Sequence, residues 1–269
     1  KNFFPSITSS KMNQHISLTI LTKNEQENIN KNFDWLKNIK TINEIIVVDD
    51  FSTDKTKDIF KSKIGNHQKL KIYQRKLDGD FSSQRQFSVS KSTNNWILWL
   101  DADEIPSPLM IEFLTKFFPT KHTHAYSFIR QELFCGFQLN YGQSKQKIIR
   151  LFDKNKGKFI GKVHEVWSTN RSKDTNIVFF HYSNQNITQI LEKINFYTDI
   201  RANQLFQNKI STNIFQIISY PIAKFFQNYI FKLGFLDGLP GIILSLFMSF
   251  HSFLVRAKLW HLYKQSSST

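Results

Sequence analysis

Mostly apolar runs alternate with segments of helical periodicity through the N-terminal part of the chain. Four of these runs have the length and composition of buried strands: 16–21, 44–50, 70–73 and 96–100. Between them, the spacing predicts helices over about 25–38 and 82–90, and Ser52 or Thr53 can cap a further helix. This alternation predicts an α/β fold with a Rossmann-like, mainly parallel sheet and right-handed crossovers.

The pattern changes after Pro108. A helix is expected over about 108–118, and three later apolar runs predict strands: 125–130, 147–152 and 177–182. From Asn186 onward the spacing is helical to the end, and the first residues are polar and lack the apolar stretch of a signal peptide. We therefore expect three parts, namely a flexible arm, an α/β domain and a helical C-terminal region: 1–15, 16–185 and 186–269.

Polar side chains follow three of the predicted strands. They form three pairs: Asn24 and Glu25, Asp49 and Asp50, and Asp101 and Asp103. The carboxyl ends of parallel strands meet at the edge where open α/β sheets bind ligands. In a strand Asp101 and Asp103 point the same way, so they can share one divalent cation that bridges a diphosphate. The alternative for Asp101 and Asp103 is an acidic helix start before Pro106 and Pro108. Turns and helix caps also favour Asp and Asn, but this preference poorly explains why polar pairs follow three separate strands.

The net charge of the chain indicates what kind of partner it attracts. The formal net charge is +15, which predicts attraction to nucleic acid, anionic lipid or phosphorylated substrates. The lysines are scattered and we find no nucleic-acid-binding motif, so we expect no nucleic-acid partner. The single cysteine, Cys135, excludes an internal disulfide and a cysteine-rich metal site.

The C-terminal segment 221–260 is strongly apolar. A break rich in glycine, 234–241, precedes the nearly apolar run Ile242–Val255, which is followed by Arg256 and Lys258. This run is about 14 residues long, short of the roughly 20 that a helix needs to cross a bilayer. Three interpretations remain: a helical hairpin packed on the α/β domain, an interfacial anchor on anionic lipid, or an oligomer interface.

Four short motifs in order resemble family 2 of the glycosyltransferases, which have the GT-A fold. They are Ile20-Leu21-Thr22-Lys23-Asn24-Glu25, Val47-Val48-Asp49-Asp50-Phe51-Ser52-Thr53-Asp54, Leu100-Asp101-Ala102-Asp103-Glu104 and Val163-His164-Glu165. Within the family, the chain is most similar to a bacterial subgroup that includes lipopolysaccharide-core glucosyltransferases, which share Arg150-Leu151-Phe152 and a segment like 232–238. Phe51 stands where a small residue is usual, and Gln86 where asparagine is more usual.

The resemblance implies inverting transfer of a sugar from a nucleotide sugar, expected to be a UDP-sugar, to an acceptor hydroxyl. Donor contacts are then expected from nine residues: Thr22, Asn24, Glu25, Asp49, Asp50, Gln84, Arg85, Asp101 and Arg150. Mg²⁺ or Mn²⁺ on Asp103, assisted by Asp101, would stabilise the leaving diphosphate, with His181 as a further ligand. For each arginine an ordinary salt bridge is the competing explanation, and for His181 a satisfied buried histidine.

An acceptor hydroxyl must lose a proton as it attacks, and a carboxylate within hydrogen-bond reach is needed. The resemblance points to Glu165 as this base, with His164 to position it, to contact the phosphates or to ligate metal. Glu104 is the alternative base, although adjacent strand residues face opposite sides.

The expected acceptor is an envelope glycan or glycolipid such as lipopolysaccharide core. We expect a cytoplasmic protein held peripherally on the inner face of the cytoplasmic membrane, and leave an oligomer open. Two rival functions are a sugar nucleotidyltransferase and a non-catalytic membrane-associated binding module. The first usually has a glycine-rich loop after the first strand, which 22–25 lacks, and the second has no need for acids at three strand ends.

Overall fold

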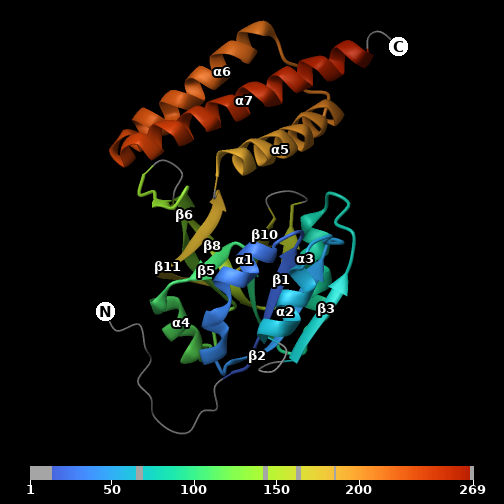
Figure 1. The fold of residues 1–269 in the computed structure, drawn as a ribbon, viewed down its shortest axis with the longest axis vertical. Helices are drawn as coiled ribbons and strands as arrows, with labels where there is room; N and C mark the ends of the chain where they lie inside the picture. The colour runs from blue at the N-terminus through green and yellow to red at the C-terminus, as the bar shows by residue number, and fades with distance from the viewer. Residues whose placement is uncertain (1–13, 65–68, 142–144, 162–164, 185, 267–269) are drawn as a thin grey trace. The chain divides into compact units, whose positions relative to one another are not determined.

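The computed structural model describes residues 14–64, 69–141, 145–161, 165–184 and 186–266 (Figure 1). The chain divides into two compact units. We call the first, Lys1–Arg130 with Lys147–His181, the α/β unit, and the second, Gln131–Gln146 with Tyr182–Thr269, the helical unit. The predicted boundary near 185 differs from this division, because 131–146 belongs with the C-terminal helices. Most of the predicted arm, 1–15, lies outside the described residues.

Four strands of the large sheet are parallel, in the order β3-β2-β1-β4. Their bounds are β1 (Ile16–Thr22), β2 (Ile42–Asp49), β3 (Lys69–Gln74) and β4 (Trp96–Asp101). The sheet continues in the order β8-β6-β11-β5, with β8 antiparallel to β4 and β7 paired with β6. These strands are β5 (Glu104–Pro106), β6 (Ala125–Phe134), β7 (Phe137–Gln138), β8 (Lys145–Asp153) and β11 (Ser172–Asn184). The predicted α/β class is confirmed, and antiparallel strands extend the parallel part.

Helices connect the strands of the α/β unit. They are α1 (Gln26–Asn32), the 3₁₀ helix η1 (Asp34–Asn38), α2 (Thr56–Ile64), α3 (Phe81–Ser90) and α4 (Pro108–Thr115). The single helix predicted over 25–38 is therefore wrong. It breaks at Phe33, whose φ of −105° is not helical, and this break lets both Phe33 and Leu36 bury in the core. The side chains of Asp80 and Ser107 cap α3 and α4, so each of these helices begins at a fixed point.

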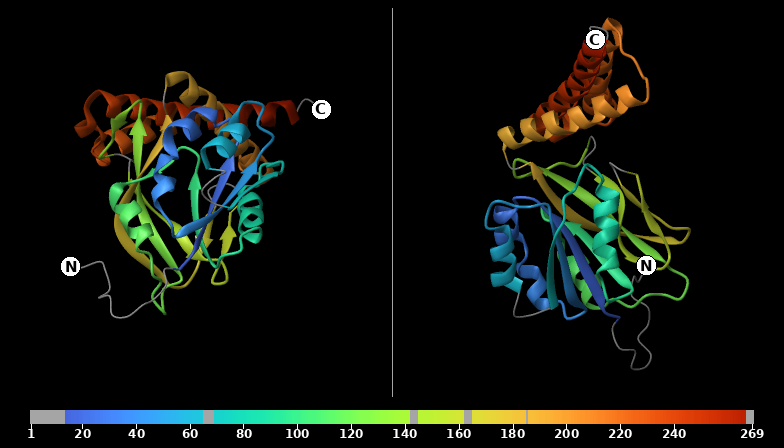
Figure 2. Two further views of the ribbon diagram at one scale, coloured as in Figure 1. Left: turned by 60° about the horizontal axis from the view of Figure 1, so that its bottom comes forward. Right: turned by 90° about the vertical axis from the view of Figure 1, so that its right-hand side faces the viewer.

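Alternation along β4 decides which elements cover each face of the sheet. Leu98 and Leu100 join a core cluster with residues of α1, α2 and α4. Ile97 and Trp99 join a second cluster that contains Val89 of α3 and aromatic residues of the hairpin β9 (Lys158–Ile160) and β10 (Val166–Ser168). Helices accordingly cover both faces of the parallel strands (Figure 2). Asp101, two residues after Trp99, lies at the end of β4 on the α3 side.

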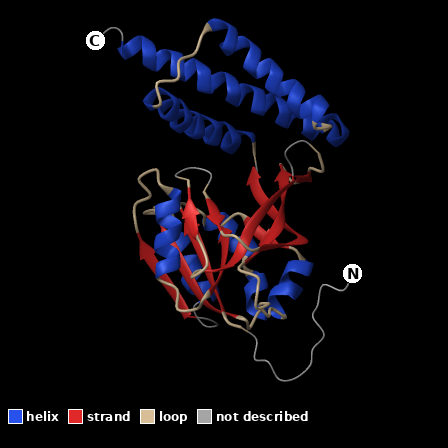
Figure 3. Cartoon of the chain, turned by 180° about the vertical axis from the view of Figure 1, so that it is seen from behind, coloured by secondary structure: helices blue, strands red, loops and turns tan. Residues whose placement is uncertain are grey.

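The helical unit is built on three long helices that pack side by side (Figure 3). They are α5 (Ile187–Gln207), α6 (Ile214–Phe226) and α7 (Gly238–Ser266), with a π-helical turn, η2 (Gln227–Phe231), and a 3₁₀ turn, η3 (Gly234–Asp237), between the last two. The segment 131–146 joins them through Asp237, whose carboxylate accepts from the backbone N–H groups of Asn140 and Tyr141 at 2.9 Å each. Phe134 and Leu139 pack against α5 in a common cluster.

The apolar run Ile242–Val255 lies inside a much longer helix. Within the described part of the chain, Gly234–Ser266 is the one stretch whose length and hydropathy suit a membrane span, with a mean hydropathy of 1.7 over 18 residues. The apolar run of about 14 residues therefore lies in a helix that continues ten residues beyond Arg256 and is long enough to cross a bilayer. The core helices of soluble proteins can have the same length and hydropathy, but they are mostly buried. Here only 17% of the 18-residue stretch is buried.

Candidate active site

Three strand ends meet at the carboxyl edge of the parallel strands. Thr22 of β1 is in register with Asp49 of β2, and Leu21 of β1 is in register with Asp101 of β4. The hydroxyl of Thr22 donates to Asp49 Oδ1 at 3.2 Å. The predicted convergence of polar residues from separate strands is present in the fold.

Arg85 of α3 ties together carboxylates from two distant segments. Its Nη2 donates to Asp101 Oδ1 at 2.5 Å, and its Nε donates to Glu165 Oε1 at 2.6 Å. The guanidinium carbon lies 3.9 Å from the ring centroid of Trp99, close enough for a cation–π contact. The Arg85 side chain is only 6% exposed, so these bonds form in a largely dry environment.

Arg150 of β8 approaches the same tryptophan and the same aspartate. Its guanidinium carbon lies 3.8 Å from the centroid of the Trp99 ring. Its Nη2 donates to Glu104 and lies 3.4 Å from Asp101 Oδ2. Trp99 was not among the residues expected at the site, although its position two residues before Asp101 on the same face was a usable signal.

The pKa values of Asp101 and Glu104, the two carboxylates that contact Arg150, shift in opposite directions. Burial raises the pKa of Asp101, but the charges of Arg85 and Arg150 outweigh it and hold the pKa well below its usual range. Burial raises the pKa of Glu104 as well, and there Arg150 only partly opposes the rise. Burial lowers the pKa of Arg85, yet Asp101 and Glu165 leave it raised overall. Asp101 is therefore ionised and Arg85 charged at neutral pH.

Asp103 lies in a turn, not on a strand. β4 ends at Asp101, and Ala102 and Asp103 form a turn before β5, so the expectation that Asp101 and Asp103 share a strand face does not hold. Asp103 Oδ2 lies 3.3 Å from Nε2 of His181, a residue that β11 places in register with Glu104. Both side chains keep some exposure, 13% for Asp103 and 15% for His181.

Asp103 and His181 form a carboxylate–imidazole pair and not a complete ligand set. Over the ranges that the structure describes, no three histidine, cysteine, aspartate or glutamate side chains gather as metal ligands. Asp101, the other expected ligand, gives one oxygen to Arg85 and lies beside Arg150 with the other. A cation at this place would therefore take two protein ligands and complete its shell with phosphate oxygens and water, as Mg²⁺ sites commonly do.

Three of the nine residues expected around the donor nucleotide, Thr22, Asn24 and Asp49, hold two loops together. Asp49 is fully buried, and its carboxylate accepts from the backbone N–H of Ser52 at 2.9 Å and from the Ser52 hydroxyl. Asn24 Oδ1 accepts from the backbone N–H of Thr53 at 2.8 Å, with Asn24 in the left-handed region at φ 56°. Phe51, also left-handed at φ 52°, is 56% exposed beside them. The loop after β1 is thus fixed to the loop after β2.

The remaining expected donor contacts divide by exposure. Asp50 accepts from Lys23 Nζ at 2.8 Å and from the backbone N–H of Leu77 at 3.1 Å. Glu25 Oε2 accepts from the side-chain amide of Asn28 at 2.6 Å. Glu25 and Asp50 are partly exposed to solvent, whereas Gln84 is buried.

Gln84 is held by Arg75, a residue that the sequence did not single out. Arg75 Nη1 donates to Gln84 Oε1 at 2.7 Å, and Gln84 Nε2 donates to the Arg75 carbonyl at 2.6 Å. The loop after β3 is thereby joined to α3. Gln84 acts in this arrangement as a structural tie and not as an exposed contact.

The two candidate bases differ in access. Glu165 is part-exposed, at 11%, with one oxygen on Arg85. Glu104 has no exposed surface, and its Oε2 accepts from the backbone N–H of Asp101 at 3.1 Å while Oε1 accepts from Arg150. Only Glu165 therefore offers surface to an acceptor. His164, expected to position Glu165, lies outside the described residues.

Comparison with known proteins identifies the class to which this site belongs. The sequence pattern described as glycosyl transferase family 2 matches residues 17–178, and the chain belongs to that family. Its fold is GT-A. The predicted family is therefore confirmed, and membership favours glycosyl transfer over nucleotidyl transfer and over a non-catalytic module.

Particular relatives align over nearly the whole chain. An uncharacterized glycosyltransferase of Rickettsia typhi is 29% identical over 262 residues, covering 91% of this chain and 86% of the relative. One of Rickettsia bellii is 29% identical over 270 residues, covering 93% and 88%. Among solved structures, the mannosyltransferase PcManGT of Pyrobaculum calidifontis, in complex with GDP-Man and Mn²⁺, has a TM-score of 0.56 at 13% identity, covering 92% of this chain and 87% of that one.

Proposed function

We propose that the protein transfers a hexose from a nucleotide sugar, in the first place a UDP-sugar, to an acceptor hydroxyl with inversion at the anomeric carbon. One observation carries the proposal. The Arg85 guanidinium joins Asp101 to Glu165 at the carboxyl edge of the sheet, where Asp103 and His181 also lie. Family membership supplies the reaction class, and this cluster supplies groups for the leaving diphosphate and for the acceptor proton.

A divalent cation fits the pair of Asp103 and His181. One carboxylate oxygen and one imidazole nitrogen, 3.3 Å apart and partly exposed, suit Mn²⁺ or Mg²⁺ when phosphate oxygens complete the shell. Bound there, the ion would neutralise charge on the leaving diphosphate. The complex of PcManGT with GDP-Man and Mn²⁺ supports the same pairing of ion and donor in this fold.

Glu165 is the proposed base. The acceptor oxygen attacks the anomeric carbon, the bond to the diphosphate breaks, and the acceptor proton passes to the Glu165 carboxylate. Arg85 orients that carboxylate through a charge-assisted hydrogen bond. Single displacement from the face opposite the leaving group gives inversion.

The donor nucleotide is proposed to lie beside the loops after β1 and β2. Asp50 and Glu25 keep surface for contacts with base or ribose. The buried groups, Asp49 and Gln84, act by fixing these loops. Thr22 and Asn24 contribute in the same way, through their bonds to Asp49 and Thr53.

The proposed acceptor is an envelope glycan or glycolipid such as lipopolysaccharide core, reached from the cytoplasmic face of the membrane. The net charge of +15 favours an anionic surface. The helical unit exposes large apolar side chains that a peripheral contact would cover: Ile214 at 72%, Phe215 at 73%, Phe231 at 80% and Leu239 at 71%.

Donor turnover tests the proposal. The purified chain is incubated with UDP- and GDP-sugars and Mn²⁺, and release of nucleoside diphosphate is measured with and without acceptor. Transfer by Glu165→Gln should fall by roughly 100-fold or more, the range for loss of a general base. Glu112→Gln is the matched control, because the Glu112 side chain is 43% exposed and pairs with Lys116 at i,i+4 on α4. Unchanged transfer by Glu165→Gln would remove the assigned base.

A further inference from the structure

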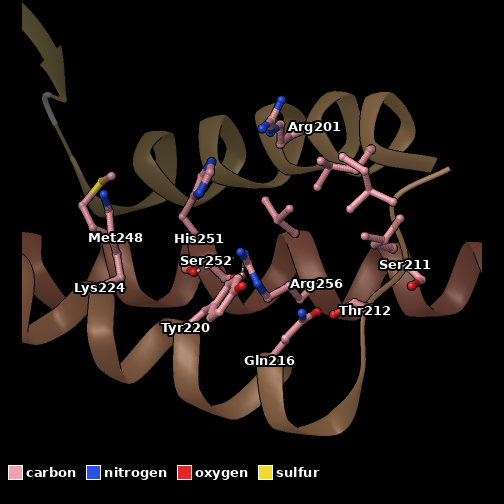
Figure 4. Close-up of a pocket in the computed structure, with 14 residues that line it drawn as sticks. Arg201, Ser211, Thr212, Gln216, Tyr220, Lys224, Met248, His251, Ser252 and Arg256 are labelled. Atoms are coloured by element: carbon pink, nitrogen blue, oxygen red, sulfur yellow. Dashed lines mark hydrogen bonds between the residues drawn. The ribbon is translucent and has the colours of Figure 1, made fainter. Parts of the chain in front are cut away.

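A cavity lies among the three long helices of the helical unit (Figure 4). Its volume is about 410 Å³, within the range of small-molecule sites. All of its lining residues come from α5, α6, α7 and the turn between α5 and α6, so none belongs to the candidate active site. Its lining includes the apolar residues Leu205, Val255 and Leu259.

The charged side chains that line this cavity are all basic: Arg201, Lys224 and Arg256. The Arg256 guanidinium carbon lies 3.9 Å from the centroid of Tyr220, and Arg201 Nη1 donates to Gln204 Oε1 at 2.6 Å. Throughout the described part of the helical unit, no carboxylate pairs with either arginine. Burial lowers the pKa of Arg256, Tyr220 partly opposes this effect, and the positive charge of Arg201 adds to it. The cavity therefore holds positive charge that an anion would compensate.

The amino end of α6 adds a second polar feature to the same cavity. Thr212 and Gln216, on either side of the N-cap residue Asn213, both line it. The Thr212 hydroxyl is buried and has no hydrogen-bond partner among the described residues. α6 is 13 residues long, so its first turn directs partial positive charge and backbone N–H groups toward this end. An orphan hydroxyl near a helix start, in a cavity that two arginines also line, provides donors for phosphate oxygens.

We propose that this cavity binds the phosphate group of an amphiphilic lipid. The arginines, the amino end of α6 and Thr212 would hold the phosphate, and the apolar lining residues Leu205, Val255 and Leu259 would contact the start of its hydrocarbon part. The exposed apolar residues of α6 provide a route to a bilayer surface, among them Phe215 and Ile218 at 73% and 56% exposure. The inference rests on the proposed membrane attachment and not on the sugar-transfer chemistry.

Binding of defined ligands to the full chain tests the inference. Isothermal titration compares dihexanoyl phosphatidic acid, below its micelle concentration, with dihexanoyl phosphatidylcholine and inorganic phosphate. We expect the phosphatidic acid to bind more tightly than both. Arg256→Gln and Arg201→Gln should each weaken it by about tenfold or more, the size of a lost charge-assisted hydrogen bond. Arg171→Gln, an exposed arginine of the α/β unit, is the control and should bind like the wild type.

A second variant guards against loss of fold. Arg256→Lys keeps the charge but removes the planar fork, and it should bind with intermediate affinity while keeping the wild-type melting temperature. Equal affinity for inorganic phosphate and phosphatidic acid would overturn the lipid assignment in favour of a free-phosphate site. Wild-type affinity in both arginine-to-glutamine variants would overturn the site itself. None of these titrations contains a sugar donor. Failure of the proposed lipid binding can therefore be distinguished from failure of the proposed glycosyl transfer.

Discussion

Nε of Arg85 lies 2.6 Å from Oε1 of Glu165, a residue 80 positions later in the chain. The bond connects α3 to the segment that precedes β10. Through its Nη2 the same guanidinium also holds Asp101 at the end of β4. The proposed base and the acid at the strand end therefore share one buried cation, and changes at Arg85 must reach both.

Replacement of Arg85 is expected to damage stability and activity together. Arg85→Gln leaves Asp101 and Glu165 without their common cation, and breaking a buried pair in this way costs about 3–5 kcal/mol. We expect urea unfolding to show a loss of this size and donor turnover to fall with it. Lys76→Gln is the control, because its pair with Asp78 is exposed at both ends and should contribute about 1 kcal/mol or less. A stable and fully active Arg85→Gln variant would show that the shared cation is dispensable.

Glu44 gives the α/β unit a pH-dependent contribution to stability. Its buried carboxylate accepts from Ser17, from Lys71 at 2.7 Å and from the backbone N–H of Thr93 at 2.8 Å. Burial raises its pKa, but these hydrogen bonds outweigh burial and place it below the ordinary value of 4.5. A lowered folded-state pKa stabilises the fold above pH 4.5, and the contribution disappears as the pH falls through the folded value.

Glu44→Gln measures that contribution. We expect the variant to be about 1–3 kcal/mol less stable than the wild type at pH 7, with the gap narrowing below pH 4.5 as the wild-type carboxylate protonates. Glu27→Gln, at an exposed i,i+4 pair with Lys31, should show a small difference at every pH. A gap for Glu44→Gln that stays constant from pH 7 to low pH would mean that packing, and not charge, causes it.

Gly241 fixes the close approach of α7 to the turn η3. A Cβ atom at this position would lie 2.0 Å from the carbonyl oxygen of Gly234, a backbone atom that cannot move aside freely. Gly241→Ala should therefore destabilise the helical unit by about 1–3 kcal/mol. Thermal unfolding compares it with Leu246→Ala on the same helix, where Leu246 is 54% exposed and little should change. Equal melting temperatures for the two variants would contradict the predicted clash.

Local pattern predicted the strand ends but not what their side chains contact. β1, β2 and β4 follow from apolar runs, and the parallel register then places Thr22 beside Asp49. The bond between Arg85 and Glu165 depends on packing between segments 80 residues apart, which no local period encodes. Asp103 was expected on a strand because the short motif Asp101-Ala102-Asp103 contains no glycine or proline that would indicate the two-residue turn after β4.

The helical unit shows a similar division. Helical spacing predicted α5, α6 and α7. The segment 131–146 joins them through the carboxylate of Asp237 and through packing of Phe134 and Leu139, long-range contacts that no local pattern encodes. α7 continues beyond the predicted apolar run, as the helical spacing after Asn186 indicates, because polar residues after Val255 interrupt that run without ending the helix.

The Mn²⁺ dependence of donor turnover by Asp103→Asn tests whether Asp103 helps to bind the cation that stabilises the leaving diphosphate. Release of UDP or GDP is measured against Mn²⁺ concentration for the wild type, for Asp103→Asn and for the exposed control Asp78→Asn. We expect metal-dependent turnover in the wild type and the control, and a kcat/KM lower by about 100-fold or more in Asp103→Asn. This is the size of loss seen when one group that stabilises developing charge is removed. Asp103→Asn with wild-type turnover and unchanged Mn²⁺ dependence would contradict this role of Asp103.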